Sequence, residues 1–278
     1  MRPRLTIITP SFNQAAFLER TLRSVLDQGY ENLEYLVVDG GSTDGSVDIL
    51  RCYDEALTWW VSEPDGGQTD ALNKALRRAT GEVIAYINSD DVYLPGAFDR
   101  AIASLEAAPE ADWVVGACRF EGEAGFTTEV WRPQPPKGAR YWWILGPWGV
   151  PQPSSFWRRA VFDDLGAFRE DLRYVFDTEH GLRLAMAGRL PLTIDDELAV
   201  RVLHDEAKSA GDDAGWAAER ERLVELYAPL LTKRERRMLG VQRALVQVGF
   251  YRATQAVHPV TGRVRRGLTK AGAILARR

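Results

Sequence analysis

The sequence has little cysteine and no long uninterrupted hydrophobic run, and each scarcity excludes a class of protein. Two cysteines among 278 residues, Cys52 and Cys118, exclude a disulfide framework and favour a reducing compartment. The most apolar stretch, residues 141–157, is broken by Pro and Gly, so it is unsuited to span a membrane. The first residues lack the apolar length of a secretion signal. We therefore expect a cytoplasmic protein.

Basic residues are outnumbered over most of the chain and concentrated at its C-terminal end. Residues 232–278 hold twelve of the 35 Lys or Arg and one of the 39 Asp or Glu, which leaves 23 basic against 38 acidic residues before them. Such a tail indicates a helix bound peripherally to anionic lipid at the inner face of the cell membrane, or a helix packed on the body or on the second subunit of a homodimer. We favour membrane contact. Nucleic acid is disfavoured because the acidic body would repel it.

Short apolar runs alternate with helical periodicity in the first 107 residues. Strands are predicted at 5–9, 33–38, 57–61 and 82–87. Helices are predicted at 15–27, from a cap at Ser42 or Thr43 to about residue 53, at 68–79 and at 97–107. This alternation predicts an α/β fold with a doubly wound, mostly parallel sheet flanked by helices. Right-handed crossovers would bring the loops after the four strands to one edge, where such sheets bind ligands.

The second half of the chain is less regular. Strands are predicted at 113–120 and 126–131, with one or two more within 190–203, and helices at 158–165, 175–187 and 214–231. We expect one large domain at 1–210, divided into a regular half at 1–110 and an irregular half at 111–210. A helical, basic C-terminal extension at 211–278 would follow.

Acidic side chains stand in the loops at the predicted sheet edge. Asp39 and Asp65 follow the second and third strands, and Asp90 and Asp91 follow the fourth. Two adjacent aspartates there repel each other unless a cation or a donor-rich ligand compensates them. A hard divalent metal takes one or two carboxylates together with phosphate oxygens. In isolation, Ser89-Asp90-Asp91 is more simply a helix cap.

Four motifs in this order resemble the nucleotide-sugar half of the family 2 inverting glycosyltransferases, which have the GT-A fold. They are Thr9-Pro10-Ser11-Phe12-Asn13, residues 37–45, residues 62–67 and Ile87-Asn88-Ser89-Asp90-Asp91. The resemblance runs from about residue 4 to about residue 210. A dinucleotide-binding Rossmann domain would need G-x-G-x-x-G after the first strand, where Pro10-Ser11-Phe12-Asn13 stands.

The resemblance implies a donor nucleotide site in the first two loops. Three residues of the first loop would cradle the nucleoside: Pro10, Ser11 and Asn13. Asp39 would contact the base. Asp65 matches a further position near the nucleotide, although a Pro-Asp-Gly-Gly turn explains it equally well.

The acidic pair resembles the family's Asp-x-Asp motif. By that match Asp90 would face the ribose or the surroundings of the metal, and Asp91 would bind Mn²⁺ or Mg²⁺. Ser89-Asp90-Asp91 departs from a strict Asp-x-Asp. The metal would offset charge that develops on the departing diphosphate.

An inverting transfer also needs a base for the acceptor hydroxyl. Residues 176–184 resemble the family's Glu-Asp motif, and alignment through Leu182-Arg183-Leu184 places the base at Asp177. The preceding Glu is Phe176 here. A charge at a helix N-terminus is the alternative for Asp177. Glu179 is an alternative base, although an i,i+4 pair with Arg183 explains it more simply.

Two further segments resemble parts of the family's site. In residues 202–209, His204 and Lys208 would close over the diphosphate, with His204 as a metal ligand and Lys208 as a point charge. A structural role for His204 is equally consistent with the sequence. On the acceptor side, we expect contacts from Trp148 and Gln152.

Together these features predict a metal-dependent inverting glycosyltransferase. It would move a sugar from a nucleoside diphosphate, in the simplest case UDP, to a hydroxyl of a saccharide or lipid-linked acceptor in cell-surface or exopolysaccharide synthesis. A nucleotidyltransferase that forms sugar nucleotides would need a Gly-rich, basic triphosphate loop after the first strand. A non-catalytic nucleotide- or carbohydrate-binding module would have no need of Asp91 and Asp177.

Overall fold

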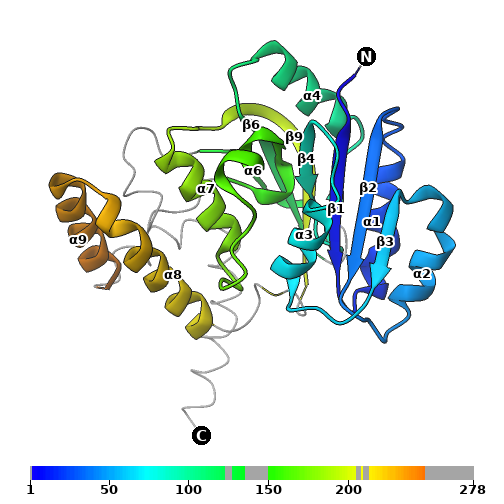
Figure 1. Ribbon diagram of the computed structural model, residues 1–278, viewed down its shortest axis with the longest axis horizontal. Helices are drawn as coiled ribbons and strands as arrows, with labels where there is room; N and C mark the ends of the chain where they lie inside the picture. Colours follow the sequence, from blue (N-terminus) through cyan, green and yellow to red (C-terminus); the bar gives the residue numbers. More distant parts are fainter. Residues whose placement is uncertain (1, 123–126, 135–149, 205–207, 209–212, 248–278) are drawn as a thin grey trace, which may run out of the picture.

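The computed structural model describes residues 2–122, 127–134, 150–204, 208 and 213–247. These residues form one curled sheet with helices on both faces (Figure 1). The strand order is β3-β2-β1-β4-β8-β6-β9-β5, and β7 pairs with β6 outside this path. Within the described residues, no helix combines the length and the apolar character that crossing a bilayer requires.

The first half of the sheet is parallel. Its strands are β1 (Leu5–Ser11), β2 (Leu33–Asp39), β3 (Trp59–Ser62) and β4 (Val83–Tyr86). The connecting helices are α1 (Ala15–Leu26), α2 (Ser46–Cys52) and α3 (Gln68–Leu76). The pairs Ser11–Asp39 and Asp39–Ser62 align three strand ends, so the loops that follow them meet at one edge, as predicted.

The second half of the sheet is mixed. It contains β5 (Val92–Tyr93), β6 (Trp113–Gly122), β7 (Thr127–Trp131), β8 (Ser155–Arg158) and β9 (Leu192–Leu203). Strand β8 lies antiparallel between β4 and β6, whereas β6 and β9 are parallel. The helices of this half are α4 (Ala97–Ala107), α6 (Ala160–Leu165), α7 (Phe176–Met186), α8 (Asp213–Tyr227) and α9 (Lys233–Gln247).

Alternating side chains of the central strands build a core on each face of the sheet. Ile7 and Val37 pack on one face with residues of α1 and α4, whereas Ile8 and Leu36 pack on the other with α3 and α7. The second core also includes buried residues of α8 and α9, namely Leu223, Val224, Tyr227 and Leu239. Helix α8 therefore shares the core of the body, while the domain boundary at residue 210 stays a prediction.

The sequence-based boundaries need three corrections. Pro10 does not end the first strand, because beyond Ile8 the strand β1 pairs only with β2, and proline is tolerated at such an edge. Strands β5 and β8 were not predicted from the sequence. The tail from Thr232 begins with α9, whose Leu239 packs in the core, and residues 248–278 lie outside the described residues, so contact with a membrane or a second subunit stays a prediction.

Candidate active site

Asp39 organises the loop that follows β2. Its Oδ2 accepts hydrogen bonds from the backbone N–H groups of Gly41 (3.1 Å) and Ser42 (2.9 Å) and from the Ser62 hydroxyl (2.6 Å). Its Oδ1 accepts one from the Ser42 hydroxyl (2.5 Å). The side chain is fully buried, at 0% exposure. A direct contact between Asp39 and a nucleobase, as predicted, therefore requires this loop to shift.

The first loop is tied to the second by side-chain contacts. Asn13 has a positive φ of 51°, its N–H donates to the Ser42 hydroxyl (2.7 Å), and its side-chain oxygen accepts from Thr43 N–H (2.9 Å). Pro10 lies within β1 beside the nearly buried Ser11. The buried Ser11 hydroxyl has no hydrogen-bond partner among the described residues, so its hydrogen-bonding capacity is unused.

Asp65 and Phe12 form the accessible rim of this region. A side-chain oxygen of Asp65 accepts from Gly67 N–H (2.8 Å), and burial raises the pKa of this half-buried carboxyl. Phe12 is 60% exposed, which is unusual for a phenyl group. A Cβ atom on Gly40 would meet Asp65 Oδ2 at 3.0 Å and Phe12 Cδ2 at 3.2 Å. The absence of a side chain at Gly40 therefore allows Asp65 and Phe12 to pack against the loop after β2.

Substituting Gly40 by Ala is expected to weaken nucleotide binding by about tenfold, because the added methyl displaces Asp65 and Phe12 from the rim. Isothermal titration calorimetry with the preferred nucleoside diphosphate measures this change. Gly240→Ala is the matched control, since a Cβ there meets nothing within 4 Å. Equal affinity in the two variants would remove this rim from the nucleotide site.

Asp90 and Asp91 lie in the loop between β4 and β5 but face different surroundings. Asp91 is 2% exposed, and its Oδ1 accepts from Val202 N–H of β9 (3.1 Å). Burial, reinforced by the charge of Asp90, raises the pKa of Asp91 well above its ordinary value. The second oxygen of Asp91 has only a long contact, 3.5 Å from Asn88 Nδ2. This oxygen is therefore the better placed of the two to meet a cation.

His204 contacts the first aspartate of the pair. Its Nε2 lies 3.0 Å from Asp90 Oδ2, and its ring packs on Phe17 with the centroids 4.4 Å apart. If Nε2 carries the proton of a neutral ring, Nδ1 keeps a lone pair. This nitrogen is buried and has no hydrogen-bond partner among the described residues. His204 thus combines a structural contact with an unused ligand atom.

The donor set at the sheet edge fits a metal that arrives with a diphosphate. Across the part of the chain that the structure describes, no three His, Cys, Asp or Glu side chains converge as a complete ligand set. Asp91 nevertheless presents a buried carboxyl group, and a nearby cation would stabilise its ionised form. Carboxylate oxygens are ligands that suit Mg²⁺ or Mn²⁺. Phosphate oxygens would have to complete the coordination.

Asp177 is the second residue of α7 and lines a small cavity with Tyr86, Gln152 and His180. Burial raises the pKa of its carboxyl, partly offset by hydrogen bonding to Thr178, whose N–H donates to Asp177 Oδ1 at 2.6 Å. Gln152 Nε2 donates to the Tyr86 carbonyl (2.8 Å). The structure therefore brings the predicted base beside the predicted acceptor-side glutamine. Trp148 lies outside the described residues.

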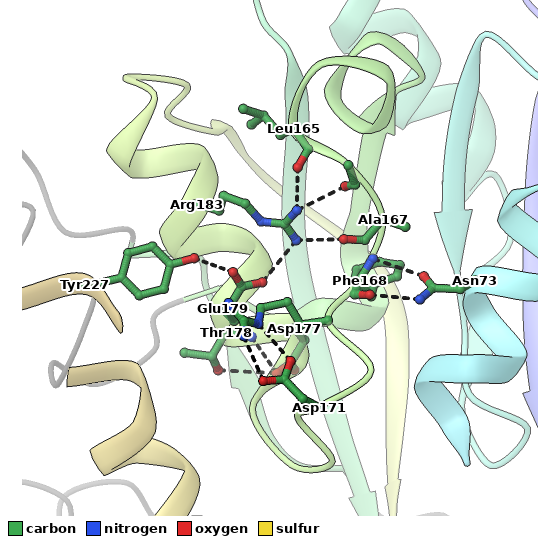
Figure 2. A network of polar contacts seen from close by, with 12 residues as sticks. Asn73, Leu165, Ala167, Phe168, Asp171, Asp177, Thr178, Glu179, Arg183 and Tyr227 are labelled. Atoms are coloured by element: carbon green, nitrogen blue, oxygen red, sulfur yellow. Dashed lines mark hydrogen bonds and ion pairs between the residues drawn. The ribbon is translucent and has the colours of Figure 1, made fainter. Parts of the chain in front are cut away.

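Glu179 makes the i,i+4 pair with Arg183 that its spacing predicted, which is confirmed by a 3.0 Å contact. It is 1% exposed and also accepts a hydrogen bond from the Tyr227 hydroxyl of α8 (Figure 2). Both oxygens are therefore occupied, which disfavours Glu179 as the base.

Sequence reasoning missed two polar residues of the site. Arg201 on β9 interacts electrostatically with both Asp91 and Asp177, and its charge lowers the pKa of each carboxyl against the effect of burial. Gln68 opens α3 and accepts from Lys208 Nζ (2.9 Å), while its amide donates to Asn88 Oδ1 (2.6 Å). The one signal in the sequence for Arg201 was its position, three residues before His204.

The sheet topology and the acidic strand end define a protein of the GT-A class. The glycosyl transferase family 2 model matches residues 6–166, and the chain belongs to this family. An uncharacterised glycosyltransferase of Mycobacterium tuberculosis is 32% identical over 196 residues, which are 69% of this chain and 72% of that protein. TuaG of Bacillus subtilis, named for teichuronic acid biosynthesis, is 43% identical over 93 residues, 32% of this chain and 37% of its own length. The chain is thus a glycosyltransferase.

Solved structures share the fold. Residues 1–349 of Staphylococcus aureus TarS, in complex with UDP-GlcNAc, superpose with a TM-score of 0.66 at 18% identity, covering 85% of this chain and 70% of that one. The mannosyltransferase PcManGT of Pyrobaculum calidifontis, in complex with GDP-Man and Mn²⁺, gives a TM-score of 0.58 at 23% identity, covering 92% and 84%. At these identities the likeness supports the fold.

Proposed function

We propose that the protein is a metal-dependent inverting glycosyltransferase that moves a sugar from a nucleoside diphosphate to a hydroxyl of a saccharide or lipid-linked acceptor. The observations that carry the proposal are two carboxyls: buried Asp91, one oxygen of which makes only a 3.5 Å contact, and Asp177, which lines a cavity with Gln152. Asp91 thus provides a carboxylate that a cation would stabilise, and Asp177, on a separate helix, provides a carboxylate that can accept a proton.

The nucleotide would occupy the loops after β1, β2 and β3. The exposed ring of Phe12 offers a stacking surface for the base, and the unpartnered Ser11 hydroxyl and the rim carboxylate of Asp65 offer polar contacts. Asp39 and Asn13 hold the two loops in place. A carboxylate accepts hydrogen bonds, so the rim carboxylate of Asp65 favours a base that carries a ring N–H. Uracil and guanine both carry one, and UDP is our first choice.

The diphosphate would lie toward Asp90, Asp91 and Lys208. Asp91, with His204 Nδ1 as a second candidate, would hold the metal, and the metal would stabilise negative charge on the leaving phosphate. Asp90 is available to the ribose through the oxygen that does not contact His204. Lys208, held on Gln68, would supply a point charge to a phosphate oxygen.

Asp177 would act as the general base. As the acceptor oxygen attacks the anomeric carbon, the carboxylate takes the hydroxyl proton and the bond to the diphosphate oxygen breaks on the opposite face. Gln152, beside Asp177 in the same cavity, would orient the acceptor, with Trp148 as the second expected contact. The name of TuaG, which refers to teichuronic acid biosynthesis, supports an acceptor in cell-envelope polysaccharide synthesis. The position at the inner face of the membrane remains part of this proposal.

Calorimetric titration with UDP, GDP, ADP and CDP, each with and without Mn²⁺, tests the donor site. We expect one nucleotide, UDP in the first instance, to bind with a dissociation constant that falls at least about tenfold when Mn²⁺ is present. The corresponding sugar nucleotides then identify the sugar. Equal binding with and without Mn²⁺ would contradict metal dependence, and no binding of any nucleotide would contradict the donor site.

A further inference from the structure

We infer that Glu219 of helix α8 is a positioning residue for Asp177, so that a helix beyond the matched family region forms part of the catalytic apparatus. This inference rests on the proposed role of Asp177 as the base. Asp177 stands at the start of α7, and the placement of a side chain there depends on how the chain enters the helix. The contacts that fix this entry come from α8.

The carboxylate of Glu219 receives three consecutive backbone N–H groups just before α7. Arg173 N–H donates to Oε1 at 2.6 Å, and Tyr174 and Val175 N–H donate to Oε2 at 2.7 and 3.0 Å. Val175 is the N-cap position of α7, yet no side chain caps the helix there. Helix α8 thus anchors, through one side chain, the three residues by which the chain enters α7.

The rest of the segment that leads into α7 is also held by side chains. Arg183 donates to the carbonyls of Leu165, Gly166 and Ala167, and Asn73 both donates to and accepts from the backbone of Phe168 (Figure 2). Glu219 provides the last of these attachments before the base. Removing it would leave the backbone from Arg173 to Val175 without these acceptors, two residues from Asp177.

A second contact aligns α8 with α7 on the far side of Asp177. Tyr227 donates its hydroxyl to Glu179, and Leu223, fully buried, lies midway between Glu219 and Tyr227 along α8. The spacing 219, 223, 227 places all three on one face of the helix. Asp177 is therefore bracketed by contacts from α8 at residues 173–175 and at residue 179. This arrangement fits a role in orientation better than a role in stability alone.

The test compares Glu219→Ala and Glu219→Gln in the full chain with Glu225→Gln as the matched control. Glu225 lies on the same helix and makes only an exposed pair with Arg222. The assay follows release of the nucleoside diphosphate from the preferred sugar nucleotide with Mn²⁺. We expect kcat to fall by about 10- to 100-fold in Glu219→Ala, while donor KM stays within about twofold of wild type.

Glu219→Gln separates orientation from folding. The amide retains one acceptor oxygen, so we expect a kcat between those of wild type and Glu219→Ala. We also expect the acid limb of the pH profile to move toward the ordinary range of aspartate, because a loosened Asp177 becomes better solvated. If both variants lose only melting temperature and keep wild-type kcat per folded molecule, Glu219 is structural and the inference is overturned.

The same assay distinguishes this inference from the proposed function. A wild-type protein that releases no nucleoside diphosphate, or an Asp177→Asn variant as active as wild type, would overturn the proposed function. An active wild type, an inactive Asp177→Asn and fully active Glu219 variants would overturn the inference alone.

Discussion

Asp177→Asn is expected to lower kcat for nucleoside diphosphate release by about 10²- to 10⁴-fold, the range that a positioned general base contributes. The amide has nearly the same shape but cannot take the proton of the attacking hydroxyl. Donor affinity should change less than twofold, because the nucleotide contacts lie in the loops after β1 to β3. Steady-state kinetics together with calorimetry of donor binding measure both quantities.

The raised pKa of Asp177 determines how its activity and its contribution to stability depend on pH. The carboxyl takes a proton only when ionised, so turnover should fall as the pH drops through a pKa above about 3.9, the ordinary value. Because the folded state favours the protonated carboxyl, stability falls as the pH rises from the ordinary pKa of aspartate through the raised pKa of the folded state, and this loss is constant at higher pH. The neutral Asn variant should therefore melt at or above the wild-type temperature at pH 7.

Asp163→Asn on α6 is the control for this experiment, because Asp163 is exposed and lies outside the cavity that Asp177 lines. An Asp177→Asn variant that is folded and retains more than about one tenth of wild-type kcat would exclude Asp177 as the base. Loss of activity accompanied by a lowered melting temperature would instead indicate that the carboxylate holds the structure.

Asp91→Asn is expected to lower kcat by about 10²-fold or more and to abolish the effect of Mn²⁺ on donor binding. An amide oxygen can still accept from Val202 N–H, so the contact between the residue before β5 and strand β9 should persist. What is lost is the negative charge that a divalent cation requires. Calorimetry of the nucleotide with and without Mn²⁺ reports the metal separately from turnover.

Asp99→Asn serves as its control, since Asp99 is an exposed aspartate at the start of α4 that pairs with Arg2. Wild-type Mn²⁺ dependence in Asp91→Asn would show that the metal is held elsewhere. Asp90 and His204 would then be the groups to substitute next, because they contact each other at 3.0 Å.

The sequence allowed a good prediction of the regular half of the fold, because there the local pattern and the tertiary structure agree. Strand β1, for example, is a short apolar run, and it is followed by α1, whose apolar residues have helical spacing. The rule that parallel strands share one carboxyl edge then predicts that Asp39, Asp65, Asp90 and Asp91 lie at that edge.

The rest depended on contacts between residues far apart in the chain. Strand β5 has only two residues, and β8 begins with Ser155 and ends with Arg158, so neither has a recognisable strand pattern. The carboxylate of Glu219 meets the backbone of Val175 across 44 positions, and nothing local in α8 indicates this. Asp39 is a second example. Its motif did not indicate that the side chain is buried beneath the backbone of Gly40–Ser42.

The most direct test of the account is the configuration of the sugar released when the protein, Mn²⁺ and the preferred α-linked sugar nucleotide react with water. Time-resolved proton NMR distinguishes the anomers before they equilibrate. Direct displacement with Asp177 as the base predicts that the β anomer forms first and that Asp177→Asn forms it about 10²- to 10⁴-fold more slowly. An α anomer as the first product would contradict direct displacement with Asp177 as the base.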